Sequence, residues 1–211
     1  APRESAEIGR LERQTAENAQ RVQAAAWQSV AALPDAETTT PEDLAGWAHV
    51  ARAAAPLLQS AGRVELAESL TQTARAIPAR PAASAHPTGH LMELSRAIQD
   101  LGADLDREPA ARDAGVEVVV TAVQAVAMTG AEHAHAAPNP QVRQLSTRLA
   151  GVATSASATI TDRRTRAVTA RQRPARAARP TAQAPAESRA ASRRDDGPRA
   201  SQETHGGPRI R

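Results

Sequence analysis

The chain has 211 residues and no cysteine, which excludes disulfides, thiolate chemistry and cysteine-based zinc sites. Leu, Ile and Val together number 31 residues, and Phe and Tyr are absent, so a large aromatic or β-sheet core is not expected. The 26 basic residues, all Arg, exceed the 23 acidic residues by only three, so the overall charge does not by itself identify a partner.

Alanine supplies most of the hydrophobic content, and it has the highest helix propensity of any residue. The composition therefore predicts an all-α fold: an Ala-rich bundle of about five or six helices with a disordered Arg-rich C-terminal tail. We expect the bundle to cover residues 1–161, with the last helix ending there or near residue 170, and the tail to cover 162–211. GC-rich coding also enriches Ala, Arg, Gly and Pro, so the number of Arg residues is weak support for any function.

The first expected helix covers residues 3–33, where apolar or small residues recur every three or four positions. These positions are Ile8, Leu11, Thr15, Ala19, Val22, Ala26, Val30 and Leu33. The other face carries mixed charges and needs no partner. Trp27 flanks the apolar stripe, so we expect it at the edge of the core.

A second helix is expected to begin at Pro41, because Thr40 can cap it and Pro suits a first helical turn. Pro56 should kink or interrupt this helix, since it removes a backbone donor and clashes with the preceding turn. Gly62 permits a tight reversal into a third helix, 63–77. A Pro- and Ala-rich linker is expected at 78–87.

The next expected helix covers residues 88–107, with apolar residues spaced alternately three and four apart. These are Leu91, Leu94, Ile98, Leu101 and Leu105. The pattern lasts only about two heptads, which favours packing within the chain over a dimeric coiled coil.

Residues 109–137 are expected to form the central core helix. The large apolar residues of this run are Val116, Val119, Val120, Val123, Val126 and Met128, and their spacing places most of them on one helix face. A strand is the alternative, because Val116, Val118 and Val120 also alternate, but no second strand is available to pair with it. Glu117 and Gln124 interrupt the apolar run, so no membrane insertion is expected.

The last helix is expected to begin at Pro140 with Asn139 as its cap. Its expected buried face consists of Val142, Leu145, Leu149, Val152, Ala156 and Ile160. Beyond Ile160 the large apolar residues nearly vanish and prolines recur from Pro174 onward, which is the composition of a disordered segment.

Charge changes sharply at the same boundary. Residues 1–161 hold 13 Arg and 18 acidic residues, whereas residues 162–211 hold 13 Arg and 5 acidic residues. The densest basic cluster consists of Arg163, Arg164, Arg166, Arg171, Arg173, Arg176 and Arg179. Such a cluster binds phosphate by counterion release, and no aromatic residues are interleaved for base stacking. It predicts nucleic acid or another polyanion as the partner; the alternative is an inert, solvated linker.

No residues with the pattern of a catalytic or metal site stand out. Pro87 separates His86 from His90, while His133 and His135 point about 200° apart on a helix. No nucleophile, phosphate-loop or dinucleotide motif occurs. We therefore expect no enzyme, cofactor or metal.

The expected function is that of a non-enzymatic scaffold or adaptor tethered by its basic tail. A protein-interaction bundle with an inert tail is the alternative, and an enzyme without a recognisable motif ranks third. The N-terminus shows no apolar signal segment, so a cytoplasmic location is expected.

Overall fold

The computed structural model describes residues 2–33, 35–41, 43–77 and 88–177, with side chains described within 6–33, 35–41, 43–77 and 89–170. The described residues form helices and connecting turns without a strand, which confirms the all-α prediction. The helices are α1 (Pro2–Ala31), α2 (Gly46–Ser60), α3 (Val64–Ala76), α4 (Thr88–Arg107), α5 (Arg112–Ala136) and α6 (Pro140–Ala177), with a short 3₁₀ helix, η1 (Pro109–Ala111), directly before α5. The chain divides into two units, Ala1–Gln172 and Arg173–Arg211, and every helix begins in the first. The expected linker 78–87 lies outside the described residues.

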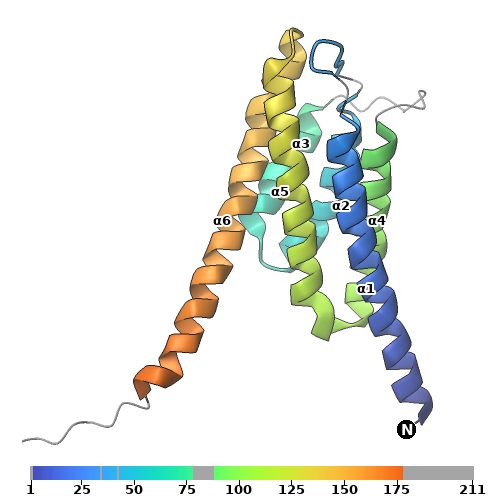
Figure 1. Cartoon of the computed structure of the whole chain (residues 1–211), viewed down its shortest axis with the longest axis vertical. Coiled ribbons are helices and arrows are strands. Elements are labelled where there is room, and N and C mark those ends of the chain that lie inside the picture. The colour runs from blue at the N-terminus through green and yellow to red at the C-terminus, as the bar shows by residue number, and fades with distance from the viewer. Residues whose placement is uncertain (1, 34, 42, 78–87, 178–211) are drawn as a thin grey trace, which may run out of the picture. The chain divides into compact units, whose positions relative to one another are not determined.

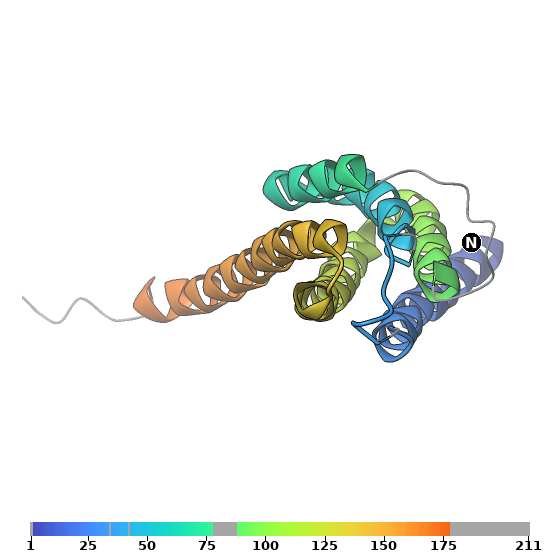
Figure 2. The same ribbon diagram turned by 90° about the horizontal axis from the view of Figure 1, so that it is seen from above.

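Helix α4 packs against both α1 and α2, and α2 also packs against α3 (Figure 1). Helix α5 contacts α1 extensively and α2 and α4 more lightly. Helix α6 runs beside α5 in both views (Figures 1 and 2), and the Gln124 side-chain amide of α5 donates to the Ser157 hydroxyl of α6 at 2.7 Å. One continuous apolar core therefore connects all six helices.

Helix α5 supplies the core as the sequence predicts. Its residues Val116, Val119, Val120, Val123 and Val126 are all at most 3% exposed. Met128, the remaining large apolar residue of this run, is 51% exposed. It follows Val126 by two residues, or about 200° around the helix, and therefore points outward.

The segment Pro109–Ala136 is long and apolar enough to cross a membrane by length and composition. Half of its most apolar stretch is buried against the rest of the chain. Its contacts with α1, α2 and α4 are those of a core helix. A buried core helix can have the same length and apolar composition as a membrane-spanning helix.

Thr40 does not cap α2, which begins at Gly46, five residues later than Pro41, with Ala45 as its N-cap. The Thr40 hydroxyl and backbone N–H both donate to Asp43 Oδ2, at 2.9 and 2.8 Å. The following backbone bonds join residues three apart, from Leu44 to Pro41 and from Trp47 to Leu44. The segment is thus a series of tight turns, and the α-helical pattern starts only at Gly46.

Of the two expected effects of Pro56, an interruption of α2 does not occur, because the helix continues to Ser60. Ala54, Ala55, Leu57 and Leu58 around it are buried, so tertiary packing offsets the missing backbone bond. Gly62 makes the predicted reversal, with a φ of 75°. The helix ends with bonds from the Arg63 N–H to the Leu58 carbonyl at 2.8 Å and from the Gly62 N–H to the Gln59 carbonyl at 3.0 Å.

Two apolar residues of α1 are more exposed than the sequence pattern predicts. Ile8 is 51% and Trp27 is 70% exposed. The buried face of α1 consists of Thr15, Asn18, Val22, Ala25, Ala26 and Ser29. Trp27 follows Val22 by five residues, which turns it about 140° away from that face. Its expected place at the core edge was therefore wrong.

A buried polar cluster joins α1 to α4. The Asp104 carboxylate is 2% exposed and accepts hydrogen bonds from the side-chain amides of Gln14 and Asn18, at 2.8 and 2.6 Å. These bonds satisfy a charge that would otherwise be costly to bury. Asn18 and Asp104 are buried between α1 and α4, whereas Gln14 is exposed at the edge of this contact.

Candidate polyanion-binding site

The candidate site is the part of α6 that follows Ile160. The helix begins at Pro140 as predicted, where Asn139 Oδ1 accepts from the Gln141 N–H at 2.9 Å. It continues to Ala177, and so ends several residues beyond residue 170, the later of the two ends predicted from the sequence. Residues 178–211 lie outside the described residues.

The sequence of this stretch explains why a helix forms without a buried face. Every side chain from 161 to 170 is exposed except that of Arg163, and Val168 is 53% exposed. Ala and Arg have high helix propensity, and the Asp162–Arg166 pair has the i,i+4 spacing that supports an isolated helix. Apolar periodicity reports burial, so it ends at Ile160 while the helix does not.

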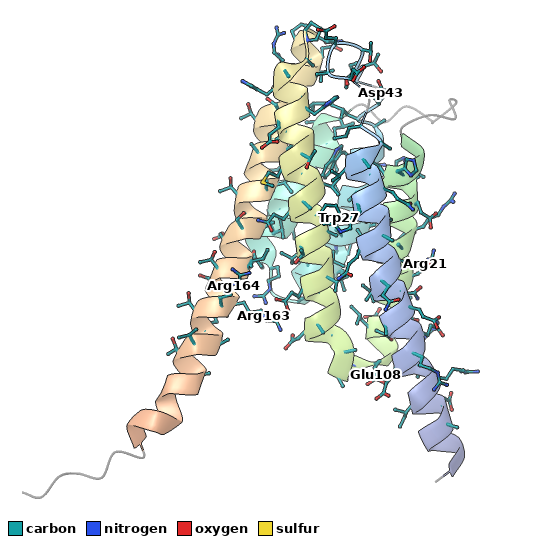
Figure 3. All side chains as sticks on the ribbon, in the orientation of Figure 1. Arg21, Trp27, Asp43, Glu108, Arg163 and Arg164 are labelled. Carbon is teal, nitrogen blue, oxygen red and sulfur yellow. The ribbon has the colours of Figure 1, made fainter. Side chains whose placement is uncertain are left out.

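Arg163 joins α6 to α5. One of its Nη1 contacts is to Glu117 Oε2 at 2.7 Å, and another is a hydrogen bond to the Asp113 backbone carbonyl at 3.2 Å. The side chains of Arg163 and Glu117 are 38% and 49% exposed, so the pair lies at the surface. Figure 3 shows Arg163 and Arg164 on α6, next to α5.

The remaining predicted arginines differ in their surroundings. Arg166 Nη2 lies 3.6 Å from Asp162 Oδ2, and both side chains are largely exposed. Arg164 is exposed and forms no ion pair with a described residue. Arg171, Arg173 and Arg176 lie within the residue range of α6, and Arg179 lies outside the described residues. The structure thus brings Arg163, Arg164 and Arg166 together on one exposed turn of helix.

Sequence reasoning missed the acidic partners of this site. The Asp162–Arg166 pair was detectable from its i,i+4 spacing. The Glu117–Arg163 pair joins two helices across 46 residues of sequence, and no local pattern indicates it. Its formation depends on how α5 and α6 pack.

Among the described residues, no group of three or more His, Asp or Glu side chains is arranged to hold a metal ion. His90 and His135 are exposed at helix ends, and His86 lies outside the described residues. His133 instead contacts the buried Thr39, with 2.5 Å between His133 Nε2 and Thr39 Oγ1. The Thr39 hydroxyl also lies 3.0 Å from the Asp35 carbonyl, so the imidazole ties the turn after α1 to the end of α5.

This contact predicts a pH dependence of stability. Burial lowers the pKa of His133 below its ordinary value of 6.5, although Asp35 and Asp43 oppose the shift. As the pH falls below about 6.5, the unfolded chain binds the proton more readily, so the free energy of unfolding decreases. Urea unfolding at pH 7.5 and 5.5 should show a smaller decrease for His133→Gln than for the wild-type chain. His135→Gln changes an exposed imidazole two residues away and should behave like the wild type; equal decreases in all three chains would contradict the assignment.

No protein-family model, curated protein or solved structure matches the chain.

Proposed function

We propose that this chain is a non-enzymatic helical scaffold that tethers itself to nucleic acid or another polyanion through the arginines that follow Ile160. The observation that carries the proposal is the exposed helical stretch 161–170, which presents Arg163, Arg164 and Arg166 without burying an apolar face. A helix with neither a core role nor an apolar partner face retains its charged surface for solvent or for a charged partner.

The distribution of charge along the chain supports a partner that carries phosphate groups. The arginines follow a body that has more acidic than basic residues, so the attraction to phosphate is concentrated at one end of the sequence. An Arg guanidinium offers a fork of donors that matches phosphate oxygens. The absence of Phe and Tyr and the scarcity of Trp favour contacts to the phosphate backbone over stacking on bases, so little sequence preference is expected.

The experiment is a fluorescence titration of labelled duplex DNA and single-stranded RNA at two salt concentrations. The variant Arg163→Gln/Arg164→Gln/Arg166→Gln should weaken binding to all sequences alike, and adding Arg171→Gln and Arg173→Gln should weaken it further. The slope of log affinity against log salt should become shallower by up to about 0.9 for each phosphate of duplex DNA that the variant no longer neutralises.

The matched control replaces Arg10, Arg13 and Arg52 by Gln, which removes the same charge from exposed positions on α1 and α2. This control should bind nearly as tightly as the wild-type chain. Equal weakening in both triple variants would show that only net charge matters, and absence of binding by the wild-type chain at low salt would remove the tethering function.

A protein-interaction bundle with an inert tail is the second candidate, and the exposure of Trp27 favours it. Large exposed Trp side chains are enriched at the centres of protein interfaces. Trp27 is 70% exposed on α1, whereas Trp47 is fully buried in α2 (Figure 3 labels Trp27). The same titration separates the candidates, because binding to DNA or RNA depends on the arginines of α6, whereas a protein-binding surface on α1 does not.

A further inference from the structure

We propose that Glu117 acts as an internal competitor of phosphate at Arg163, and that Asp162 does so more weakly at Arg166, so that these two carboxylates limit the affinity of the site. The inference rests on the proposed function and adds to it a means by which the chain restrains its own binding. It is carried by the two ion pairs, which occupy two of the three arginines in the described part of the site.

The Glu117 carboxylate lies where it opposes phosphate binding in two ways. Its Oε2 forms an ion pair with Arg163 Nη1 at 2.7 Å. A phosphate that binds the same Nη1 donor must displace the Glu117 carboxylate. A phosphate that approaches the other guanidinium nitrogens remains close to the carboxylate and is repelled by its charge. Either approach lowers the affinity that Arg163 would otherwise contribute.

Arg63 adds a second cation to the surroundings of Glu117. It lies at the start of α3, and together with Glu117, Ile160 and Arg163 it lines a small cavity between α3, α5 and α6. Glu117 therefore shares this lining with two arginines, Arg63 before α3 and Arg163 on α6. Removing the negative charge of Glu117 leaves Arg63 and Arg163 as the charged residues of this lining.

The two carboxylates should differ in strength. The Glu117–Arg163 distance is 2.7 Å, the two side chains are 49% and 38% exposed, and the Asp113 carbonyl also accepts a hydrogen bond from the guanidinium. The Asp162–Arg166 distance is 3.6 Å, and both side chains are more than 70% exposed, so solvent and salt screen this pair strongly. Neutralising Glu117 should therefore increase binding more than neutralising Asp162.

The test uses the full chain and a labelled duplex of about 20 base pairs at low salt. Glu117→Gln keeps the size of the side chain and removes its charge, and we expect its dissociation constant to fall by about 3- to 10-fold relative to wild type, because Arg163 becomes free to neutralise one more phosphate. The salt slope should steepen by up to about 0.9. Asp162→Asn should give a smaller gain. Glu132→Gln, an exposed position at the other end of α5, changes the net charge equally and controls for it.

A second background separates a specific ion pair from a general charge effect. In chains that carry Arg163→Gln, Glu117→Gln should increase affinity no more than Glu132→Gln does, because the competing pair is already absent. Thermal melts of each variant should stay within about a degree or two of wild type, since exposed ion pairs contribute little to stability.

The outcomes distinguish this inference from the proposed function. If the wild-type chain binds DNA and Glu117→Gln gains no more than Glu132→Gln, the inference is overturned while the tethering function stands. If the gain of Glu117→Gln persists in the Arg163→Gln background, the competition at Arg163 is overturned. If neither wild type nor Glu117→Gln binds at low salt, both the inference and the proposed function are overturned.

Discussion

Replacing Val120 by Asp is expected to unfold the chain or to bring it close to unfolding at 25 °C. Val120 is 2% exposed and lies on the core face of α5, among side chains from a single apolar cluster. An unpaired buried carboxylate costs several kcal/mol, comparable to the total stability of a marginal domain. The core of this chain consists largely of Ala, Val and Leu, so its reserve of stability is small.

The measurement is far-UV circular dichroism during thermal unfolding. We expect either loss of the helical signal at 25 °C or a midpoint lowered by about 8–16 °C, which corresponds to roughly 4 kcal/mol in a chain of this size. Thr121→Asp is the matched control, because Thr121 is the next residue on α5 and is exposed. A Val120→Asp chain that melts like the Thr121→Asp chain would show that α5 is not the centre of the core.

Replacing Gly46 by Ala is expected to destabilise the chain by about 1–3 kcal/mol, the usual cost of overpacking a core. Gly46 is the first residue of α2, and an added Cβ would lie 2.6 Å from Leu91 Cβ of α4. Since that atom is attached directly to the α4 backbone, it cannot move without displacing the helix. The α2–α4 contact must therefore open.

Gly102→Ala is the matched control for this substitution. A Cβ at Gly102 meets nothing within 4 Å, and Gly102 lies in the interior of α4, where Ala is favoured over Gly by roughly 0.5–1 kcal/mol. Chemical denaturation of both variants should shift the midpoint in opposite directions. A Gly46→Ala chain as stable as Gly102→Ala would mean that α2 and α4 are not in the close contact described.

The helical class and most helix positions were available from the sequence because they depend on local patterns. The three-and-four spacing of Leu91, Leu94, Ile98, Leu101 and Leu105 predicted α4 with the bounds that the structure has. The valines of α5 and the Asn139–Pro140 start of α6 were equally local. The Gly62 reversal required only a residue that accepts a positive φ.

Other features depended on which neighbours each helix meets. The start of α2 at Gly46 and the uninterrupted passage through Pro56 are features of a helix embedded between α3, α4 and α5. Periodicity placed Trp27 beside the apolar stripe of α1. The packing of α4 and α5 buries three residues of that stripe, Thr15, Val22 and Ala26, together with the neighbouring Asn18, Ala25 and Ser29, and leaves Trp27 exposed. A sequence stripe has a width of several residues, and only the neighbouring helices decide which edge of it is covered.

For the candidate site, the sequence by itself determined the cluster of arginines and the loss of apolar residues after Ile160, because both are matters of composition. It did not determine that the helix continues to Ala177, since apolar periodicity ends at Ile160 while helix propensity favours continuation. Only the tertiary structure decided that Arg163 meets Glu117, because the two residues lie 46 positions apart and approach only where α6 packs on α5. A contact between helices is fixed by their relative rotation and register, which depend on the whole interface and on no local pattern in either helix.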